Sequence, residues 1–218
     1  MIKVAPSILA ADYSRLGDEV ADAVRCGADY IHFDVMDGVF VNNITGGIPM
    51  LTSLRRVTDA FLDVHLMVER PVRYAAAFCE AGADLVNFHV EADDTDNILK
   101  ALSIVRSYGK KTGITLCPGT PAEAIIPFIG SIDLVLVMTV VPGQGGQTFM
   151  PEQLQVIHGV RNILESRGVH CEVEVDGGII LETAVEAVRA GADVLVSGST
   201  IFHAQNRAKV IDDLKHIH

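Results

Sequence analysis

The chain has 218 residues, of which 49% are hydrophobic and 21% are charged, and its formal net charge is −11. This apolar fraction excludes a disordered or collagen-like chain, and the length is enough for one domain with a large core. The acidic excess, 28 Asp and Glu against 17 Lys and Arg, argues against nucleic acid as a partner.

The sequence also predicts where the protein works. No stretch approaches 18 consecutive apolar residues, and the first ten residues lack a basic segment followed by a cleavage site, so we expect neither a membrane span nor export. The four cysteines are far apart and form no Cys-x-x-Cys pair, which suits reduced thiols. We therefore expect a cytoplasmic protein.

A near-repeat divides the chain into units. Gly27-Ala28-Asp29, Gly82-Ala83-Asp84 and Gly191-Ala192-Asp193 each follow an Ala-rich amphipathic segment and precede a β-branched or aromatic run. The copies lie 55 and 109 residues apart, so two strand-helix units in each 55 residues give about eight units in the chain. Eight units predict an α/β fold, a single (β/α)8 TIM barrel spanning residues 1–218, with a doubly wound open sheet as the alternative.

The hydrophobic pattern predicts strands and helices in strict alternation, which implies a parallel sheet. In chain order, the expected strands are residues 3–8, 30–36, 61–67, 85–90, 112–117, 134–140, 172–176 and 194–198. The helices expected after them are residues 14–26, 50–57, 72–81, 95–108, 121–129, 151–167, 181–190 and 206–216.

Polar side chains gather at the carboxyl ends of three predicted strands, where the reactive groups of a barrel lie. His32 and Asp34 share one face of the second strand, His65 lies near the end of the third, and Asp176 ends the seventh. Each alone is more simply a satisfied core or capping group. Together, two imidazoles and two carboxylates favour a site for one divalent ion, Zn, Fe, Mn or Co. His89, followed by Glu91, has less support and is interpreted as structural.

Glycine-rich turns follow the last three predicted strands, at residues 142–147, 176–178 and 197–199. Glycines let backbone N–H groups approach a phosphate, and a short helix beginning at Ser199 would point its positive end at one. Tight turns alone are the alternative, but three such turns in succession favour a phosphate site. No dinucleotide-binding fingerprint follows the first strand, so no nucleotide cofactor is expected.

Three methionines, Met36, Met67 and Met138, lie at predicted strand ends. They are either barrel filler or a soft lining of the site, and their position beside the candidate ligands favours the lining.

Seven motifs, in order along the chain, closely resemble the ribulose-phosphate 3-epimerase family. They are Ala5–Leu9 with Ser7, His32–Gly38, Asp63–Met67, Val137–Thr139, Pro142–Gln147, Glu174–Gly178 and Ser197–Ser199.

The resemblance implies a metal-dependent isomerase of the pentose phosphate pathway that interconverts D-ribulose 5-phosphate and D-xylulose 5-phosphate, a small phosphorylated ketose, and that forms a homo-oligomer. By matching position, Asp34 would accept and Asp176 donate a proton in one direction. The implied metal ligands are His32, Asp34, His65 and Asp176. The implied substrate contacts are Ser7, His65, Gly143, Gln144, Gly145, Gly146, Asp176, Gly177, Gly178, Gly198 and Ser199.

The chain departs from the family's usual motifs at Val39, Asn42, Cys117 and Gln144. None of these is a proposed ligand or acid-base group, but Val39 and Gln144 lie in loops that can cover a substrate and so bear on sugar specificity.

Three alternatives stay open. A sister 3-epimerase acting on another ketose phosphate, such as D-allulose 6-phosphate, would share every catalytic residue. A metal-free decarboxylase or lyase on the same barrel would resemble enzymes with a D-x-K-x-x-D pattern, but Asp34 is followed by Val35-Met36-Asp37 and no Lys. A silent sugar-phosphate binding protein would not need all four polar groups.

Overall fold

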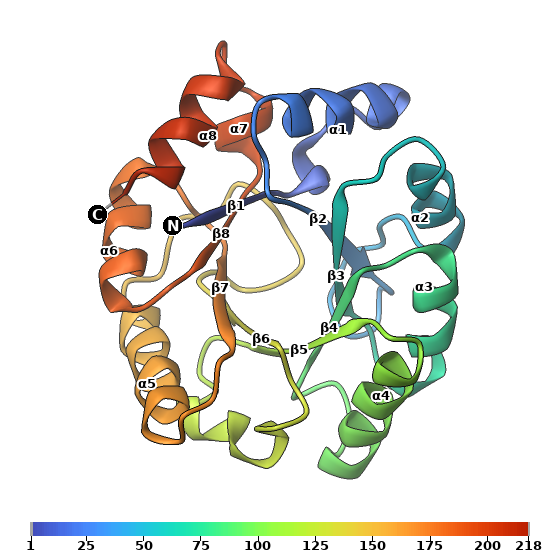
Figure 1. Cartoon of the computed structure of the whole chain (residues 1–218), viewed down its shortest axis with the longest axis vertical. Helices are drawn as coiled ribbons and strands as arrows, with labels where there is room; N and C mark the ends of the chain where they lie inside the picture. The colour runs from blue at the N-terminus through green and yellow to red at the C-terminus, as the bar shows by residue number, and fades with distance from the viewer. Residues whose placement is uncertain (1, 218) are drawn as a thin grey trace.

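Eight parallel strands form the centre of the molecule and helices surround them (Figure 1). The structure, a computed structural model, describes residues 2–217; Met1 and His218, the ends of the predicted domain, lie outside the described residues. The strands are β1 Lys3–Pro6, β2 Tyr30–Met36, β3 Phe61–Met67, β4 Leu85–His89, β5 Lys111–Leu116, β6 Leu134–Met138, β7 Glu172–Asp176 and β8 Val194–Ser197.

The sheet closes into a barrel. Its strand order is β1-β8-β7-β6-β5-β4-β3-β2, and β1 and β2 meet through a parallel bridge between Ser7 and His32. The backbone N–H of Asp29, just before β2, also donates to the carbonyl of Val4 at 3.0 Å. The predicted (β/α)8 barrel is therefore confirmed, and the open-sheet alternative is wrong.

Side chains alternate along each strand between the barrel interior and the helix layer. On β2, Ile31 and Phe33 belong to the large core between strands and helices, whereas His32 and Asp34 share the opposite, inward face. The helix layer thus takes the apolar set, and the period of two leaves the polar set inside the barrel.

The helical segments follow the predicted order, with corrections at their ends. The helices are α1 Leu16–Arg25, α2 Ile48–Arg55, α3 Ala75–Ala81, α4 Thr95–Ser107, α5 Gln153–Ser166, α6 Leu181–Ala190, α7 Ser199–Phe202 and α8 Arg207–Lys215. Shorter 3-10 segments are η1 Ile8–Ala10, η2 Tyr13–Arg15, η3 Pro71–Arg73 and η4 Ala122–Phe128. The α-helix expected at residues 121–129 is wrong, because η4 contains Pro127, which has no N–H to donate to the previous turn.

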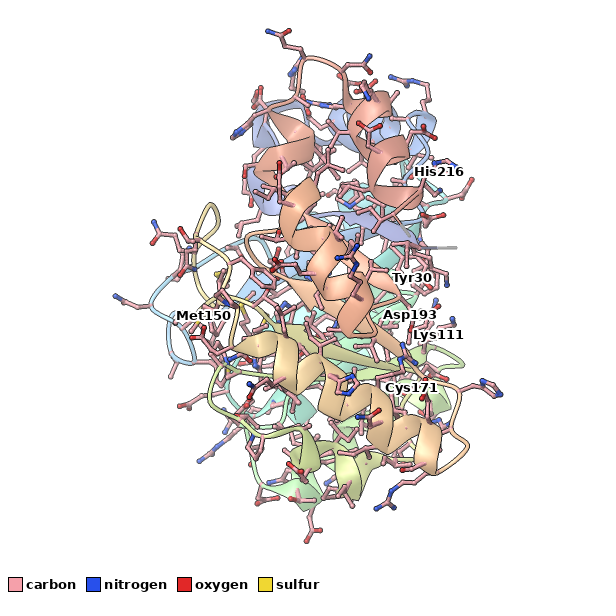
Figure 2. All side chains as sticks on the ribbon, turned by 90° about the vertical axis from the view of Figure 1, so that its left-hand side faces the viewer. Tyr30, Lys111, Met150, Cys171, Asp193 and His216 are labelled. Carbon is pink, nitrogen blue, oxygen red and sulfur yellow. The ribbon has the colours of Figure 1, made fainter. Side chains whose placement is uncertain are left out.

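The Gly-Ala-Asp repeat closes the amino-terminal end of the barrel. Each Gly ends a helix with a positive φ, of 100°, 110° and 116° at Gly27, Gly82 and Gly191. Each Asp then accepts a hydrogen bond from a backbone N–H of the preceding strand in the chain: Asp29 from Val4 at 2.9 Å, Asp84 from Leu62 at 2.9 Å, and Asp193 from Val173 at 3.0 Å. Figure 2 shows Tyr30, Lys111 and Asp193 at this end and Met150 at the other.

Candidate active site

The four predicted metal ligands meet inside the barrel at its carboxyl-terminal end. One ligand atom from each of His32, Asp34, His65 and Asp176 lies within 4.8 Å of the others. His32 and Asp34 come from β2, His65 from the neighbouring β3, and Asp176 from the end of β7. His32 and His65 are wholly buried, and Asp34 is 6% exposed.

The donor set fits a divalent cation. His32 Nδ1 lies 2.6 Å from Asp63 Oδ2, and its other nitrogen, Nε2, is buried without a hydrogen-bond partner. That nitrogen lies 3.4 Å from Asp34 Oδ1 and 3.8 Å from Asp176 Oδ2. An unpartnered imidazole nitrogen beside two carboxylates suits a metal ion that accepts both atom types.

The two carboxylates are shifted in opposite directions. Burial, together with the neighbouring Asp34, raises the pKa of Asp176 to about 7. Burial also opposes ionisation of Asp34, but His32 and His65 outweigh it and hold the pKa of Asp34 well below its usual range. One carboxyl group is therefore ionised at neutral pH, and the other is partly protonated.

The histidines are shifted in opposite directions too. Burial lowers the pKa of His32, but the Asp34 and Asp63 carboxylates outweigh it and raise that pKa well above its usual value. Burial lowers the pKa of His65 to about 4, so this ring is neutral at physiological pH. The carboxylates of Asp34 and Asp63 beside His32 make the potential here negative, as a cation site requires.

A cavity of about 700 Å³ opens above this cluster. Every predicted substrate contact except His65 lines it, as do the three predicted methionines; these lining residues are Ser7, Met36, Met67, Met138, Gly143, Gln144, Gly145, Gly146, Asp176, Gly177, Gly178, Gly198 and Ser199. The methionines are at most 3% exposed. His65 lies beneath the cavity, wholly buried.

Two glycines in the cavity wall allow a close approach of backbone. A Cβ on Gly178, whose φ is +66°, would lie 2.4 Å from the backbone nitrogen of Phe149, and one on Gly177 would lie 2.4 Å from a methyl group of Val140. No other residue fits there without moving the loop after β6. The turn after β7 therefore presents bare peptide groups to the cavity.

Several residues of the site escaped the sequence-based prediction. Asp63 and Glu174 share the inward faces of β3 and β7, so the period of two could have found them. Phe149, in the loop after β6, and Leu9, in the short 3-10 segment η1, also line the cavity, but neither stretch is long enough to give a periodic signal. His89 contacts His65 across the strands, with their Nε2 atoms 2.9 Å apart.

Known proteins share this arrangement of motifs. A model of the ribulose-phosphate 3-epimerase family matches residues 3–202. The ribulose-phosphate 3-epimerase of Bacillus subtilis is 45% identical over 99% of both chains, and that of Mycobacterium bovis is 46% identical over 97% of this chain and 91% of its own. The chain belongs to the ribulose-phosphate 3-epimerase family. It is therefore an isomerase, and the predicted resemblance is confirmed.

Solved structures of other enzymes share only the fold with this epimerase. 3-Hexulose-6-phosphate synthase from Salmonella typhimurium superimposes with a TM-score of 0.72 over 99% of this chain and 98% of its own, at 17% identity. KGPDC from Streptococcus mutans superimposes with a TM-score of 0.71 over 100% of this chain and 99% of its own, at 14% identity.

The departures from the family's usual motifs fall in two loops and one strand end. Val39 and Asn42 are exposed in the loop after β2, and Gln144 lies in the loop after β6 and lines the cavity. Asn43 Nδ2 donates to the Gly143 carbonyl at 2.8 Å, so these two loops touch. Cys117 follows β5, beside His89.

Proposed function

We propose that this epimerase interconverts D-ribulose 5-phosphate and D-xylulose 5-phosphate by moving one proton off and another onto the carbon next to the ketone. The observation that carries the proposal is the pair Asp34 and Asp176. Their carboxyl groups face one cavity from two strands, and their pKa values are driven apart. Inversion at such a carbon requires a base on one face and an acid on the other.

Asp34 is the proposed proton acceptor in one direction, and Asp176 the donor. Ser7 Oγ donates to Asp34 Oδ2 at 2.6 Å, which fixes the rotation of that carboxylate and leaves its other oxygen towards His65. In the reverse direction the roles exchange. The buried methionines exclude water from the planar intermediate between the two transfers.

His32, Asp34, His65 and Asp176 would hold one divalent ion. A bound Zn, Fe, Mn or Co ion would act as a Lewis acid that stabilises the negative charge developing on the sugar oxygens. Its identity is set by supply as much as by this ligand set.

Backbone groups of the last three turns would hold the phosphate. Gly177, Gly178, Gly198 and Ser199 line one side of the cavity, and Gly143 to Gly146 line another. The bare peptide groups forced by Gly177 and Gly178 support this assignment. No Lys or Arg side chain lines the cavity, so among the described residues backbone and hydroxyl donors would carry phosphate recognition.

Side-by-side assays test the substrate. Metal-loaded protein is expected to turn over D-ribulose 5-phosphate faster than D-allulose 6-phosphate, and Asp176→Asn is expected to abolish both activities. Faster turnover of the hexose phosphate would move the function to a sister epimerase, and activity on neither would overturn the proposal.

Assembly and location remain proposals. A homo-oligomer is expected from the resemblance, and sedimentation of the metal-loaded protein checks it. Among residues 2–217 no helix is both long and apolar enough to cross a bilayer. Four free cysteines support a cytoplasmic location, although one relative is named chloroplastic and another cytoplasmic.

A further inference from the structure

His65 meets a second buried histidine that the proposed reaction does not use. His65 Nε2 and His89 Nε2 lie 2.9 Å apart, and both rings are wholly buried. Two neutral rings in this position share a single proton, so one Nε2 must donate and the other must accept. Which ring donates decides whether His65 Nδ1, on the opposite side of the ring, carries a proton or a free lone pair.

The other side of the His89 ring has an acceptor that favours one of these two arrangements. His89 Nδ1 lies 3.4 Å from Glu91 Oε2 and 3.2 Å from Cys117 Sγ. A carboxylate only accepts hydrogen bonds, and it is a stronger partner than a thiol. With Glu91 accepting from His89 Nδ1, His89 Nε2 accepts and His65 Nε2 donates. A proton on His65 Nδ1, donated to Asp34 Oδ1 at 3.3 Å, is the other arrangement open to the metal-free site.

Glu91 is held where this role requires it. Its Oε1 accepts from the backbone N–H of Cys117 at 2.9 Å and from the hydroxyl of Thr120. The ring of Phe40 packs against the ring of His89 at a centroid distance of 4.7 Å. The carboxylate and the ring that it orients thus have fixed neighbours in the loops after β5 and β2.

We infer that Glu91 and His89 form a hydrogen-bond relay that fixes the tautomer of His65 in which Nδ1 offers its lone pair to the metal. His65 Nδ1 lies 3.3 Å from Asp34 Oδ1. A cation held by both atoms would need the lone pair of His65 Nδ1, which leaves the ring proton on Nε2, as the relay requires. Asp63 does the same for His32 through a single carboxylate, so each candidate histidine ligand has its own orienting chain. Glu91 and His89 are positioning residues.

A metal ion bound by His89, Glu91 and Cys117 themselves is the competing interpretation, because their donor atoms also lie within 4.8 Å of one another. Burial raises the pKa of the Cys117 thiol, and Glu91 adds to that rise, so the thiol is a poor ligand. One oxygen of Glu91 already accepts two hydrogen bonds.

The isosteric variant Glu91→Gln tests the relay. Its amide oxygen would keep the bonds from Cys117 and Thr120, and its NH2 would donate to His89 Nδ1. The relay then reverses and puts a proton on His65 Nδ1. We expect the Co2+ affinity to fall about 10- to 100-fold. Nitrogen NMR shifts of His65 in the metal-free protein should show a larger share of the Nδ1-protonated tautomer than in the parent. Glu123→Gln, at an exposed position on η4, is the matched control and should bind Co2+ like the parent.

Two variants at His89 test the relay independently, in case Glu91→Gln does not fold. His89→Gln keeps an acceptor for His65 Nε2 and should retain most of the affinity, whereas His89→Leu should lose it. Equal affinity in these two variants, or unchanged affinity and tautomer in Glu91→Gln, would overturn the relay. A second equivalent of Co2+ with thiolate absorption that disappears in Cys117→Ala would also overturn it in favour of a metal site.

The inference rests on the proposed function only in taking the four-residue cluster as the metal site. Its readouts need no turnover. A parent protein that binds Co2+ with the inferred tautomer but epimerises no sugar would count against the proposed function alone.

Discussion

Asp176 carries a proton that competes with a divalent ion at the proposed metal site. Burial and the neighbouring Asp34 raise its pKa to about 7 in the metal-free protein, from an ordinary value of 3.8. Ligation requires the ionised carboxylate, so the proton on Asp176 competes with the metal below this pKa.

Through Asp176 alone the Co2+ affinity should rise about tenfold between pH 6 and pH 8, the factor expected for one competing proton of pKa near 7. The proton on His32, whose pKa is raised as well, should make the rise steeper. Titration with a competing chelator at each pH measures it. The contribution of Asp176 should vanish in Asp176→Asn, and a pH-independent affinity in the parent would contradict the assignment.

Gly178 is the residue on which the shape of the proposed phosphate pocket depends. In Gly178→Ala the left-handed backbone costs roughly 1–2 kcal/mol, and the new Cβ, 2.4 Å from the nitrogen of Phe149, adds about 1–3 kcal/mol of overpacking. Urea unfolding should show a loss of stability equal to the sum of these two costs. KM should rise because the loop after β6 must move.

Gly109→Ala is the control for backbone strain. Gly109 has a similar φ of +70°, but nothing lies within 4 Å of its added Cβ. Gly109→Ala should lose only the roughly 1–2 kcal/mol of stability that the left-handed backbone costs, and its KM should not change. Equal losses of stability in the two variants would show that the close approach at Gly178 does not matter.

At the scale of elements, the Asp of each Gly-Ala-Asp copy joins the start of one strand to the preceding strand. Asp84 accepts from the N–H of Leu62 at 2.9 Å, and Arg55 Nη1 donates to it at 2.8 Å. The repeat that predicted the number of units is thus a device that aligns strands in pairs at the amino-terminal end.

Asp84→Ala should lower the free energy of unfolding by about 1–3 kcal/mol, because it leaves a strand N–H and an Arg without their charged partner. Activity at low temperature should persist, since Asp84 lies at the end opposite the cavity. Asp59→Ala, at an exposed position nearby, should stay within about 0.5 kcal/mol of the parent in the same urea titration. An equally large loss of stability in Asp59→Ala would contradict the stabilising role assigned to the Asp of the repeat.

The elements show what sequence could and could not predict. Helix α6 matches its predicted bounds, Leu181–Ala190. Ile180, just before it, has an extended backbone, and Gly191, just after it, has a positive φ. The predicted helix at residues 14–26 begins instead as a 3-10 turn capped by Asp12, and only the local hydrogen bond of that side chain to Ser14 sets this start. Periodicity finds the body of an element better than its first turn.

The site shows the same division. The proposed ligands could be predicted to lie together, because they share the inward faces of β2, β3 and β7; they are His32, Asp34, His65 and Asp176. The role inferred for His89 could not be predicted. It depends on β4 lying beside β3 in the register that pairs His65 with Asn87, and the sequence of one strand does not show this register.

For the whole molecule, barrel closure is the condition for the chemistry. β2 and β7 carry Asp34 and Asp176, and β1 and β8 separate them in the sheet. Only curvature of the closed sheet brings both carboxylates within reach of His32 Nε2. We propose that residues 1–218 form one domain, because the two acid-base groups come from opposite halves of the chain.

Proton transfer followed in D2O tests the two-carboxylate account most directly. Metal-loaded protein is mixed with D-ribulose 5-phosphate, and NMR follows the hydrogen on the inverted carbon. Because the proton removed by one carboxylate is not the one returned by the other, every molecule of D-xylulose 5-phosphate formed should carry deuterium there, and Asp176→Asn should form none. Product that keeps its original hydrogen, or an Asp176→Asn variant that epimerises at the parent rate, would contradict the account.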